Sequence, residues 1–173
     1  VETAFIFNSK LDARQLLKAI LVELDIDCQT DDTAQMTHEL YQFLLAKKIE
    51  GKSVVLLIDE AQNLSRETLE QLRLLSNLET TRNKLLQIIL VGQPELTLVL
   101  NAYDMRQLRQ RINLSCRIKP LNAEETRQYI THRVNKAGSC AQTLFTRGAA
   151  ALVYRYSKGT PRLINILCDR ALV

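Results

Sequence analysis

The chain has 173 residues, of which 46% are hydrophobic and 24% are charged, and its formal net charge is +4. This length and composition predict one domain or one and a half with a buried core, and they exclude a disordered chain. The basic residues are spread along the sequence, so the mild positive balance permits a nucleic-acid partner without requiring one.

The cysteines and the hydropathy pattern indicate a protein of a reducing compartment. The four cysteines are too widely spaced for a CxxC metal site or a dense disulfide framework, and we expect buried thiols. No stretch approaches the length of a transmembrane helix, and no basic and apolar leader opens the chain. We therefore expect a domain of cytosolic character and, because the first residue is Val1, one that begins inside a longer protein.

Strands and helices alternate along the first 120 residues. The first helix opens with the capping pair Asp12 and Gln15, the second ends near Gly51, and Ser65 caps the third. In chain order the predicted elements are a strand at 3–7, helices at 11–26 and 33–51, a strand at 54–58, a helix at 65–81, a strand at 86–91, helical pieces at 96–112 and a short strand at 115–119.

Only helices are predicted after residue 120. Asn122 and Glu125 form a capping pair for the first, a second follows at 144–159, and Pro161 occupies the first position of a third. This change of pattern predicts an α/β domain at residues 1–120 followed by a small helical domain at 121–173.

Two adjacent carboxylates, Asp59 and Glu60, follow the apolar strand at 54–58. A carboxylate costs several kcal/mol to desolvate unless it is paired, hydrogen-bonded or bound to a metal, so this strand end must open onto something polar. In an open α/β sheet, ligands bind beyond the carboxyl ends of parallel strands. There Asp59 would reach a magnesium ion and Glu60 would polarise a water. The alternative is that both acids only solvate a strand end.

The acid pair and the motifs around it resemble those of the AAA+ ATPases. The segments "LLIDEAQNLSRETLEQLRLLSNLET", "LLQIILVGQPEL", "ETRQYITHRVNKAG" and "GTPR" resemble, more narrowly, the ExeA/GspA (general secretion pathway protein A) type, secretion-associated ATPases related to the MshM proteins of pilus biogenesis. The likeness covers nearly the whole chain. It implies an α/β fold with an incomplete P-loop NTPase parallel sheet and flanking helices, followed by a small all-helical lid.

The resemblance implies roles for four side chains around ATP. Asp59 matches the Walker B aspartate that holds Mg²⁺, and Glu60 matches the glutamate that activates the attacking water. Gln93 matches the sensor-1 position, with an ordinary turn residue before Pro94 as the alternative. Arg162 matches the sensor-2 arginine of the lid, with a solvent-exposed arginine as the alternative.

Two further positions follow from the same resemblance. Among Arg106, Arg109 and Arg111, the best match to the arginine finger that reaches a neighbouring subunit's nucleotide is Arg111, while a solvated basic face is the alternative. Asn8, at the end of the first strand, could restrain Glu60 before activation.

One required part of the family pattern is absent from the sequence. None of the five glycines begins the G-x-x-x-x-G-K-[ST] loop that binds the β and γ phosphates. The family's strand order of 5-1-4-3-2 places the missing strand between the strands that end at Val91 and Lys119. We expect a chain from which the first strand and Walker A loop have been cut away, and we expect these residues alone to hydrolyse ATP poorly or not at all.

The resemblance implies an ATP-binding and hydrolysing module that drives assembly of a bacterial secretion or pilus system. Its expected cofactors are ATP and Mg²⁺, and its expected partners are further copies in an oligomeric ring and the membrane proteins of that system. Nucleic acid is not an expected partner. The expected location is the cytoplasm, in a protein attached to the inner membrane. Two alternatives stay open: a DNA-associated AAA+ ATPase of the transposition or replication-initiator kind, and a scaffold that never hydrolyses ATP.

Overall fold

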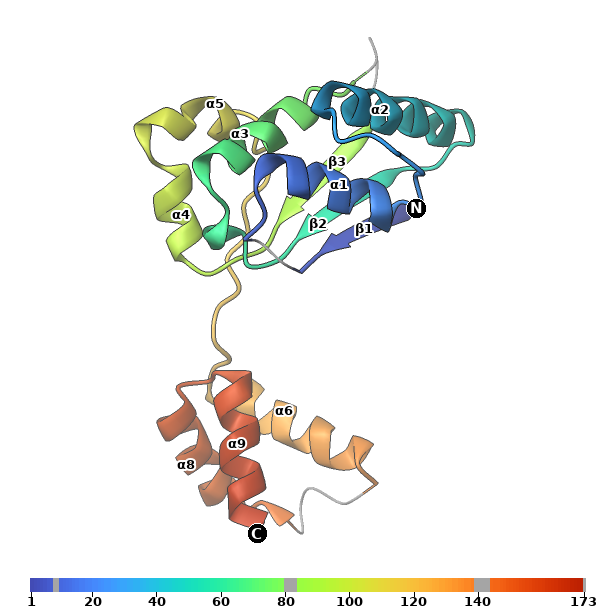
Figure 1. Ribbon diagram of the computed structural model, residues 1–173. Helices are drawn as coiled ribbons and strands as arrows, with labels where there is room; N and C mark the ends of the chain where they lie inside the picture. The colour runs from blue at the N-terminus through green and yellow to red at the C-terminus, as the bar shows by residue number, and fades with distance from the viewer. Residues whose placement is uncertain (8–9, 80–83, 139–143, 173) are drawn as a thin grey trace. The chain divides into compact units, whose positions relative to one another are not determined.

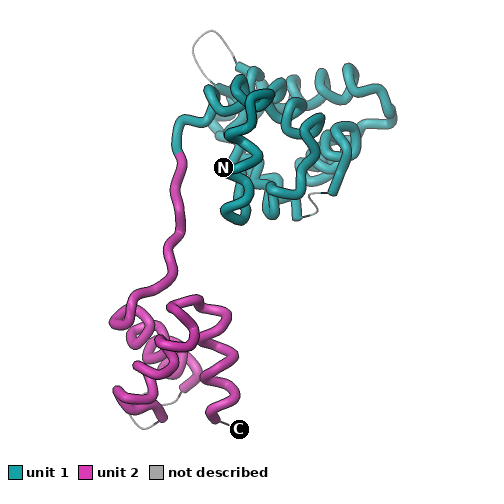
Figure 2. The backbone as a smooth tube through the Cα atoms, turned by 90° about the vertical axis from the view of Figure 1, so that its left-hand side faces the viewer, with its two compact units in different colours: residues 1–114 teal, residues 115–173 magenta. Residues whose placement is uncertain are grey.

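A computed structural model describes residues 1–7, 10–79, 84–138 and 144–172 (Figure 1). The chain divides into two compact units, unit 1 at Val1–Leu114 and unit 2 at Ser115–Val173 (Figure 2). Strands occur in unit 1, while the described elements of unit 2 are helices, so the predicted α/β fold followed by helices is confirmed. No helix in the described part of the chain is both long and apolar enough to cross a bilayer.

The elements of unit 1 begin where the capping residues predict. The Asp12 carboxylate accepts a hydrogen bond from the Gln15 N–H at 2.7 Å, and the Asp12 N–H donates to the Gln15 side chain at 3.1 Å. The Ser65 hydroxyl accepts from the Thr68 N–H at 3.1 Å. The described elements are β1 (Glu2–Ile6), α1 (Ala13–Glu23), α2 (Thr33–Ile49), β2 (Val54–Ile58), the short 3-10 helix η1 (Ala61–Asn63), α3 (Arg66–Leu75), β3 (Leu86–Leu90), α4 (Glu95–Leu100), the 3-10 helix η2 (Tyr103–Met105) and α5 (Arg106–Arg109).

The three described strands form one parallel sheet in the order β1-β2-β3. Residues 115–119, predicted as a strand, are not one. A single strand is unstable without a neighbour to accept its hydrogen bonds. No strand of the described sheet pairs with residues 115–119, so these residues have no neighbour to accept their hydrogen bonds.

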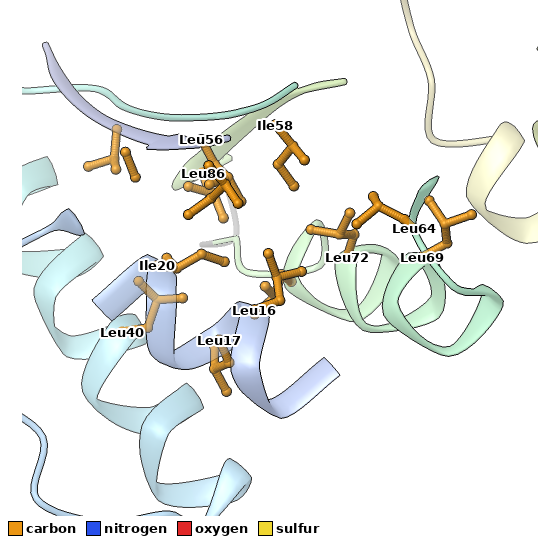
Figure 3. Close-up of a cluster of buried hydrophobic side chains, with 14 of the residues drawn as sticks. Leu16, Leu17, Ile20, Leu40, Leu56, Ile58, Leu64, Leu69, Leu72 and Leu86 are labelled. Atoms are coloured by element: carbon orange, nitrogen blue, oxygen red, sulfur yellow. The ribbon is translucent and has the colours of Figure 1, made fainter. Parts of the chain in front are cut away.

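One face of the sheet carries the core of unit 1. Ala4, Leu56 and Ile88 are register partners on this face, as are Ile6, Ile58 and Leu90. Figure 3 shows side chains from the sheet lying against those of α1, α2 and α3. Fully buried side chains of this cluster include Leu16, Leu17, Ile20, Leu40, Leu56, Ile58, Leu69 and Leu72.

The opposite face of the sheet is only partly covered. Phe5, Leu57 and Ile89 are register partners there, and Phe5 and Leu57 are half-buried while Ile89 keeps 45% of its surface exposed. Phe7, two residues beyond Phe5, is 74% exposed. Parallel sheets in α/β proteins are usually covered on both faces. This face of unit 1 is therefore less covered than is usual for a parallel sheet.

Ion pairs gather at the amino end of the sheet, and we call Glu2, Lys47, Glu50 and Lys52 the amino-end cluster. Lys47 Nζ lies 3.2 Å from Glu2 and 3.8 Å from Glu50, and Lys52 Nζ lies 3.4 Å from Glu2 and 2.9 Å from Glu50. The hydrogen bond from Lys47 is the main cause that lowers the pKa of Glu2. The hydrogen bond from Lys52 is the main cause that lowers the pKa of Glu50.

The described helices of unit 2 are α6 (Ala123–Lys136), α8 (Arg147–Ser157) and α9 (Pro161–Leu172). The predicted capping pair is confirmed, because the Asn122 N–H donates to Glu125 Oε2 at 2.8 Å and the Glu125 N–H donates to Asn122 Oδ1 at 2.9 Å. The small core of unit 2 consists of Ile130, Ala150, Val153 and Ile164 with partly buried neighbours.

A close backbone contact joins the entry of unit 2 to the loop before α9. The Leu121 N–H donates to the Gly159 carbonyl at 2.9 Å, and Gly159 has φ +77°. A Cβ atom at position 159 would lie 1.8 Å from the Leu121 carbonyl oxygen, far inside van der Waals contact. Only glycine satisfies both the positive φ and this approach.

Candidate functional site

The candidate site lies at the carboxyl end of the sheet. There, backbone hydrogen bonds between neighbouring segments continue beyond the ends of the strands. The Asp59 N–H donates to the Ile6 carbonyl at 3.0 Å, so Asp59 stays beside the end of β1. The Ala61 N–H donates to the Val91 carbonyl at 2.9 Å, so the residue after the acid pair stays beside the end of β3. Asp59 and Glu60 are therefore fixed between the two neighbouring strand ends.

Glu60 has an uncommon backbone conformation. Its φ of 52° and ψ of 35° place it in the left-handed region, which costs a non-glycine residue roughly 1–2 kcal/mol. The Glu60 N–H donates to Asp59 Oδ1 at 2.8 Å, and this bond supports the turn from β2 into η1. Such conformations persist where the surroundings impose them, and they are frequent at functional sites.

Two glutamine side chains contact the Glu60 carboxylate. Gln62 Nε2 donates to Glu60 Oε2 at 2.6 Å, and Gln93 Nε2 donates to the same oxygen at a longer 3.4 Å. The Gln93 backbone N–H donates to Gln62 Oε1 at 3.0 Å. The structure thus brings Asp59, Glu60 and Gln93 together at one edge, as the sequence predicts, while their roles toward a nucleotide stay predictions.

Gln62 is a site residue that the sequence analysis missed. Its side chain fits because position 92 is glycine: a Cβ atom there would lie 2.6 Å from Gln62 Oε1. The signal in the sequence was the spacing of Glu60 and Gln62. It could be interpreted only once the left-handed turn at Glu60 was known, because that turn makes the two side chains neighbours.

The carboxylates of the site suit a Mg²⁺ ion that also binds phosphate. Asp59 uses Oδ1 to accept from Glu60, and among the described residues no hydrogen bond reaches Asp59 Oδ2. No group of three or more His, Cys, Asp and Glu side chains within the described ranges could hold a metal alone. Mg²⁺ is usually held by one or two carboxylates together with substrate phosphates and waters, so this small donor set fits it.

The site carries no compensating cation from the part of unit 1 that the structure describes. Each ion pair of the described residues joins side chains other than Asp59 and Glu60. Two glutamine amides and the Glu60 backbone N–H are the described donors to the carboxylates of the acid pair. The negative charge of the pair is therefore available to a cation from outside these contacts.

The three arginines predicted near the finger position differ in their contacts. Arg106 lies over the Tyr103 ring, with 4.8 Å from its guanidinium carbon to the ring centroid, and Arg109 donates to Asn101 Oδ1 at 3.2 Å. Arg111 follows α5, is exposed, and makes no hydrogen bond or ion pair through its guanidinium with a described residue. Arg111 is thus the free guanidinium of the three, and its role as a finger stays a prediction.

Two predicted site residues lie outside this geometry. Arg162 is an exposed residue in the first turn of α9. It belongs to unit 2, and each unit is described by itself, so its predicted sensor role stays a prediction. Asn8 lies outside the described residues, and its predicted contact with Glu60 stays a prediction as well.

Two pockets lie away from the acid pair. One of about 440 Å³ lies between β1 and α1, and one of about 390 Å³ lies between α6 and α8. Asp59, Glu60, Gln62 and Gln93 line neither pocket. At this edge of the sheet Glu60 and Gln93 are exposed, while Asp59 and Gln62 are half-buried.

Comparison with known proteins gives a consistent result. The AAA domain family matches residues 3–100. General secretion pathway protein A of Aeromonas hydrophila is 44% identical over 173 residues, which cover 99% of this chain and 31% of that protein. The chain therefore spans about a third of that relative.

Solved structures agree on the fold. The ORC2 protein of Aeropyrum pernix has a TM-score of 0.62 at 13% identity, over 98% of this chain and 53% of that one. The RuvB Holliday junction branch migration motor of Thermotoga maritima has a TM-score of 0.53 at 16% identity, over 98% of this chain and 54% of that one. At such identities the likeness shows the fold alone.

Proposed function

The chain belongs to the family of AAA domains, and from this membership we propose that it forms part of an ATP-hydrolysing module of a bacterial secretion system. The predicted resemblance to the general secretion pathway protein A type is confirmed by the 44% identity along the whole chain. The observation that carries the proposal is the gathering of Asp59, Glu60 and Gln93 at the carboxyl end of a parallel sheet.

The acid pair divides two tasks of ATP hydrolysis. Asp59, whose Oδ2 accepts no hydrogen bond from a described residue, would hold the magnesium ion of Mg–ATP. When bound, this ion neutralises charge on the phosphates. Glu60 orients and polarises the attacking water, and the Gln93 amide lies close enough to Glu60 to bridge that water and the γ-phosphate. Phosphoryl transfer needs positioning and charge neutralisation more than covalent chemistry. In this proposal, Glu60 and Gln93 supply the positioning, and the ion held by Asp59 would supply the neutralisation.

The phosphate-binding loop of the complete site comes from outside these 173 residues. None of the five glycines begins that loop, so these residues supply the metal-holding and water-activating side of the site alone. Two features of unit 1 support the addition of a strand and its helix: β3 is an edge strand of the described sheet, and the face with Phe5, Leu57 and Ile89 is partly exposed. We expect the isolated 173 residues to hydrolyse ATP poorly or not at all.

In this proposal, two arginines supply positive charge to the phosphates, one from a neighbouring copy and one from the helical unit. Arg111, with its free guanidinium, reaches the nucleotide of a neighbouring copy, and the module works as an oligomeric ring. Arg162 reaches phosphate oxygens from the helical unit, which acts as a lid and responds to the bound nucleotide. Further partners are membrane proteins of a secretion or pilus system, and the module works in the cytoplasm, in a protein attached to the inner membrane.

The two alternatives receive less support. A DNA-associated ATPase would share the fold of the ORC2 and RuvB proteins, but likeness at 13% and 16% identity shows no more than the fold. A non-hydrolysing scaffold has no need for a strained Glu60 held by two amides beside a half-free Asp59.

The experiment that tests the proposal compares two proteins. One is the full-length protein that contains this chain, and the other is the isolated 173 residues. We expect Mg²⁺-dependent release of phosphate from ATP by the first and little or none by the second. ATP binding without turnover by the full-length protein would favour the scaffold, and turnover that needs duplex DNA would favour the DNA-associated ATPase.

A further inference from the structure

The Gln62 side chain uses both ends of its amide within the site. Its Nε2 donates to Glu60 Oε2 at 2.6 Å, and its Oε1 accepts from the Gln93 N–H at 3.0 Å. The first bond joins an amide to a carboxylate, and hydrogen bonds to an ionised group are shorter and stronger than neutral ones. Gln62 therefore connects the acid after β2 to the segment after β3.

The contact with Gln62 leaves the two oxygens of Glu60 unequal. Oε2 receives Gln62 at 2.6 Å and Gln93 at 3.4 Å, whereas no hydrogen bond from a described residue reaches Oε1. A glutamate on the surface otherwise samples many rotamers, and fixing it costs side-chain entropy. A short bond to Oε2 reduces this freedom before a reactant arrives and leaves Oε1 without a hydrogen bond from a described residue.

The Gln62 amide occupies space beside position 92 that a side chain there would enter. A Cβ atom at position 92 would lie 2.6 Å from Gln62 Oε1 and 3.2 Å from a methyl group of Leu96, so the Gln62 amide would have to move from its present place. Gly92 has no positive φ, so backbone conformation does not require glycine here. The glycine makes room for Gln62.

We propose that Gln62 is the positioning residue of Glu60: its amide holds Oε2, so that Oε1 is presented to the attacking water. This inference rests on the proposed ATP hydrolysis. The competing interpretation is that Gln62 only ties the η1 turn to the segment after β3 through the Gln93 N–H. The two interpretations differ in which end of the amide matters.

Two substitutions test the donor end and the acceptor end of the Gln62 amide separately. Gln62→Met has a similar length and removes both hydrogen bonds. Gln62→Glu keeps an oxygen for the Gln93 N–H but replaces the donor to Glu60 with a second carboxylate. Asn63→Leu is the matched control, because Asn63 is the exposed neighbouring amide in η1 and its side chain has no hydrogen bond with a described residue.

The measurement is steady-state ATP hydrolysis by the full-length protein. We expect Gln62→Met to lower kcat about tenfold or more, the size found for partners that orient a reacting group, and to leave the KM for ATP unchanged. Gln62→Glu should lose at least as much, because like charges then face each other. Asn63→Leu should match wild type. A Gln62→Glu protein with wild-type kcat would show that only the Gln93 end matters and would overturn the proposal.

A double-mutant cycle excludes a general loss of folding as the cause. In the Glu60→Gln background, Gln62→Met should cause no further loss of kcat, because its effect acts through Glu60. Equal losses in both backgrounds would overturn the proposal. If Gln62→Met does not fold, Gln62→Glu in the same cycle decides the question. Absent turnover in wild type would overturn the proposed function itself, whereas wild-type turnover with an unchanged kcat in Gln62→Met would overturn only the positioning role.

Discussion

The two ends of the sheet hold their carboxylates in different ways. At the amino end, Glu2 and Glu50 are each shared between Lys47 and Lys52, with the nearest nitrogen at 3.2 Å and 2.9 Å. At the carboxyl end, the carboxylates of Asp59 and Glu60 accept hydrogen bonds from one backbone N–H and from two glutamine amides, and the ion pairs of the described residues do not include them.

The two groups of carboxylates differ in whether lysines of the same unit neutralise them. The amino-end cluster is neutralised within unit 1, and it joins the start of β1 to the end of α2 and the start of β2. An amide donates a hydrogen bond without neutralising a carboxylate, so the described contacts of the acid pair leave its negative charge uncompensated. In the proposed function, that charge is available to the magnesium ion of Mg–ATP.

The largest expected effect is that of Glu60→Gln, which is compared with the same substitution at the amino end. Glu60→Gln in the full-length protein should lower ATP turnover about 10³-fold or more while ATP still binds, because general acid–base groups contribute 10²–10⁴-fold. Glu2→Gln, the matched control at the amino end, should leave turnover unchanged. Phosphate release and nucleotide binding measure the two effects. Similar turnover in both variants would remove the functional distinction between the ends.

The second prediction concerns a positive charge for the carboxyl end of the sheet, where no described cation pairs with Asp59 or Glu60. Arg111→Ala should lower turnover about 10²-fold where copies assemble, the effect found when one donor to transition-state charge is removed. At concentrations too low for assembly, the variant and wild type should have the same low rate. Turnover measured against protein concentration tests this, with Arg109→Ala as the control because Arg109 bonds to Asn101. An equal proportional loss at every concentration would argue against a contact between copies.

The third prediction concerns the metal. Asp59→Asn should raise the Mg²⁺ concentration needed for half-maximal turnover about 10- to 100-fold, the size found when a residue that supports a metal ligand is removed, because a neutral amide oxygen replaces an ionised ligand. Titration of Mg²⁺ at fixed ATP measures the change. An unchanged requirement would place the metal elsewhere.

The smallest effect is the pH dependence of folding at the amino end. The pKa values of Glu2 and Glu50 are lowered in the folded chain by the lysines, so these groups add stability above the usual carboxyl pKa near 4.5. That contribution is lost as the pH falls through the lowered values. The melting temperature of Glu2→Gln should therefore decrease less than that of wild type between neutral pH and about pH 3. Parallel curves would show that the cluster contributes nothing measurable.

Much of the fold follows from local rules that the sequence displays. The capping pairs at Asp12 and Asn122 and the cap at Ser65 form as predicted, because they depend on residues three positions apart. The strand at 54–58 follows from its apolar run. The prediction of a strand at 115–119 was wrong, because a strand depends on a neighbouring strand as well as on its own residues.

The candidate site was predictable in part. Asp59, Glu60 and Gln93 follow strand ends, and parallel strands bring such ends to one edge of the sheet. Gln62 was not predictable, because its contact requires the left-handed turn at Glu60 and the space beside Gly92. Both are properties of three-dimensional packing that no periodicity in the sequence reports.

The contact between Gly159 and Leu121 has a mechanical consequence for the helical unit. Leu121 lies at the point where the chain enters α6, and Gly159 lies three residues before Arg162. Backbone meets backbone here with no side chain between, so a residue larger than glycine at position 159 would push the segment that enters α6 away from the loop before α9. The contact therefore holds the start of α6 close to the start of α9 within the helical unit.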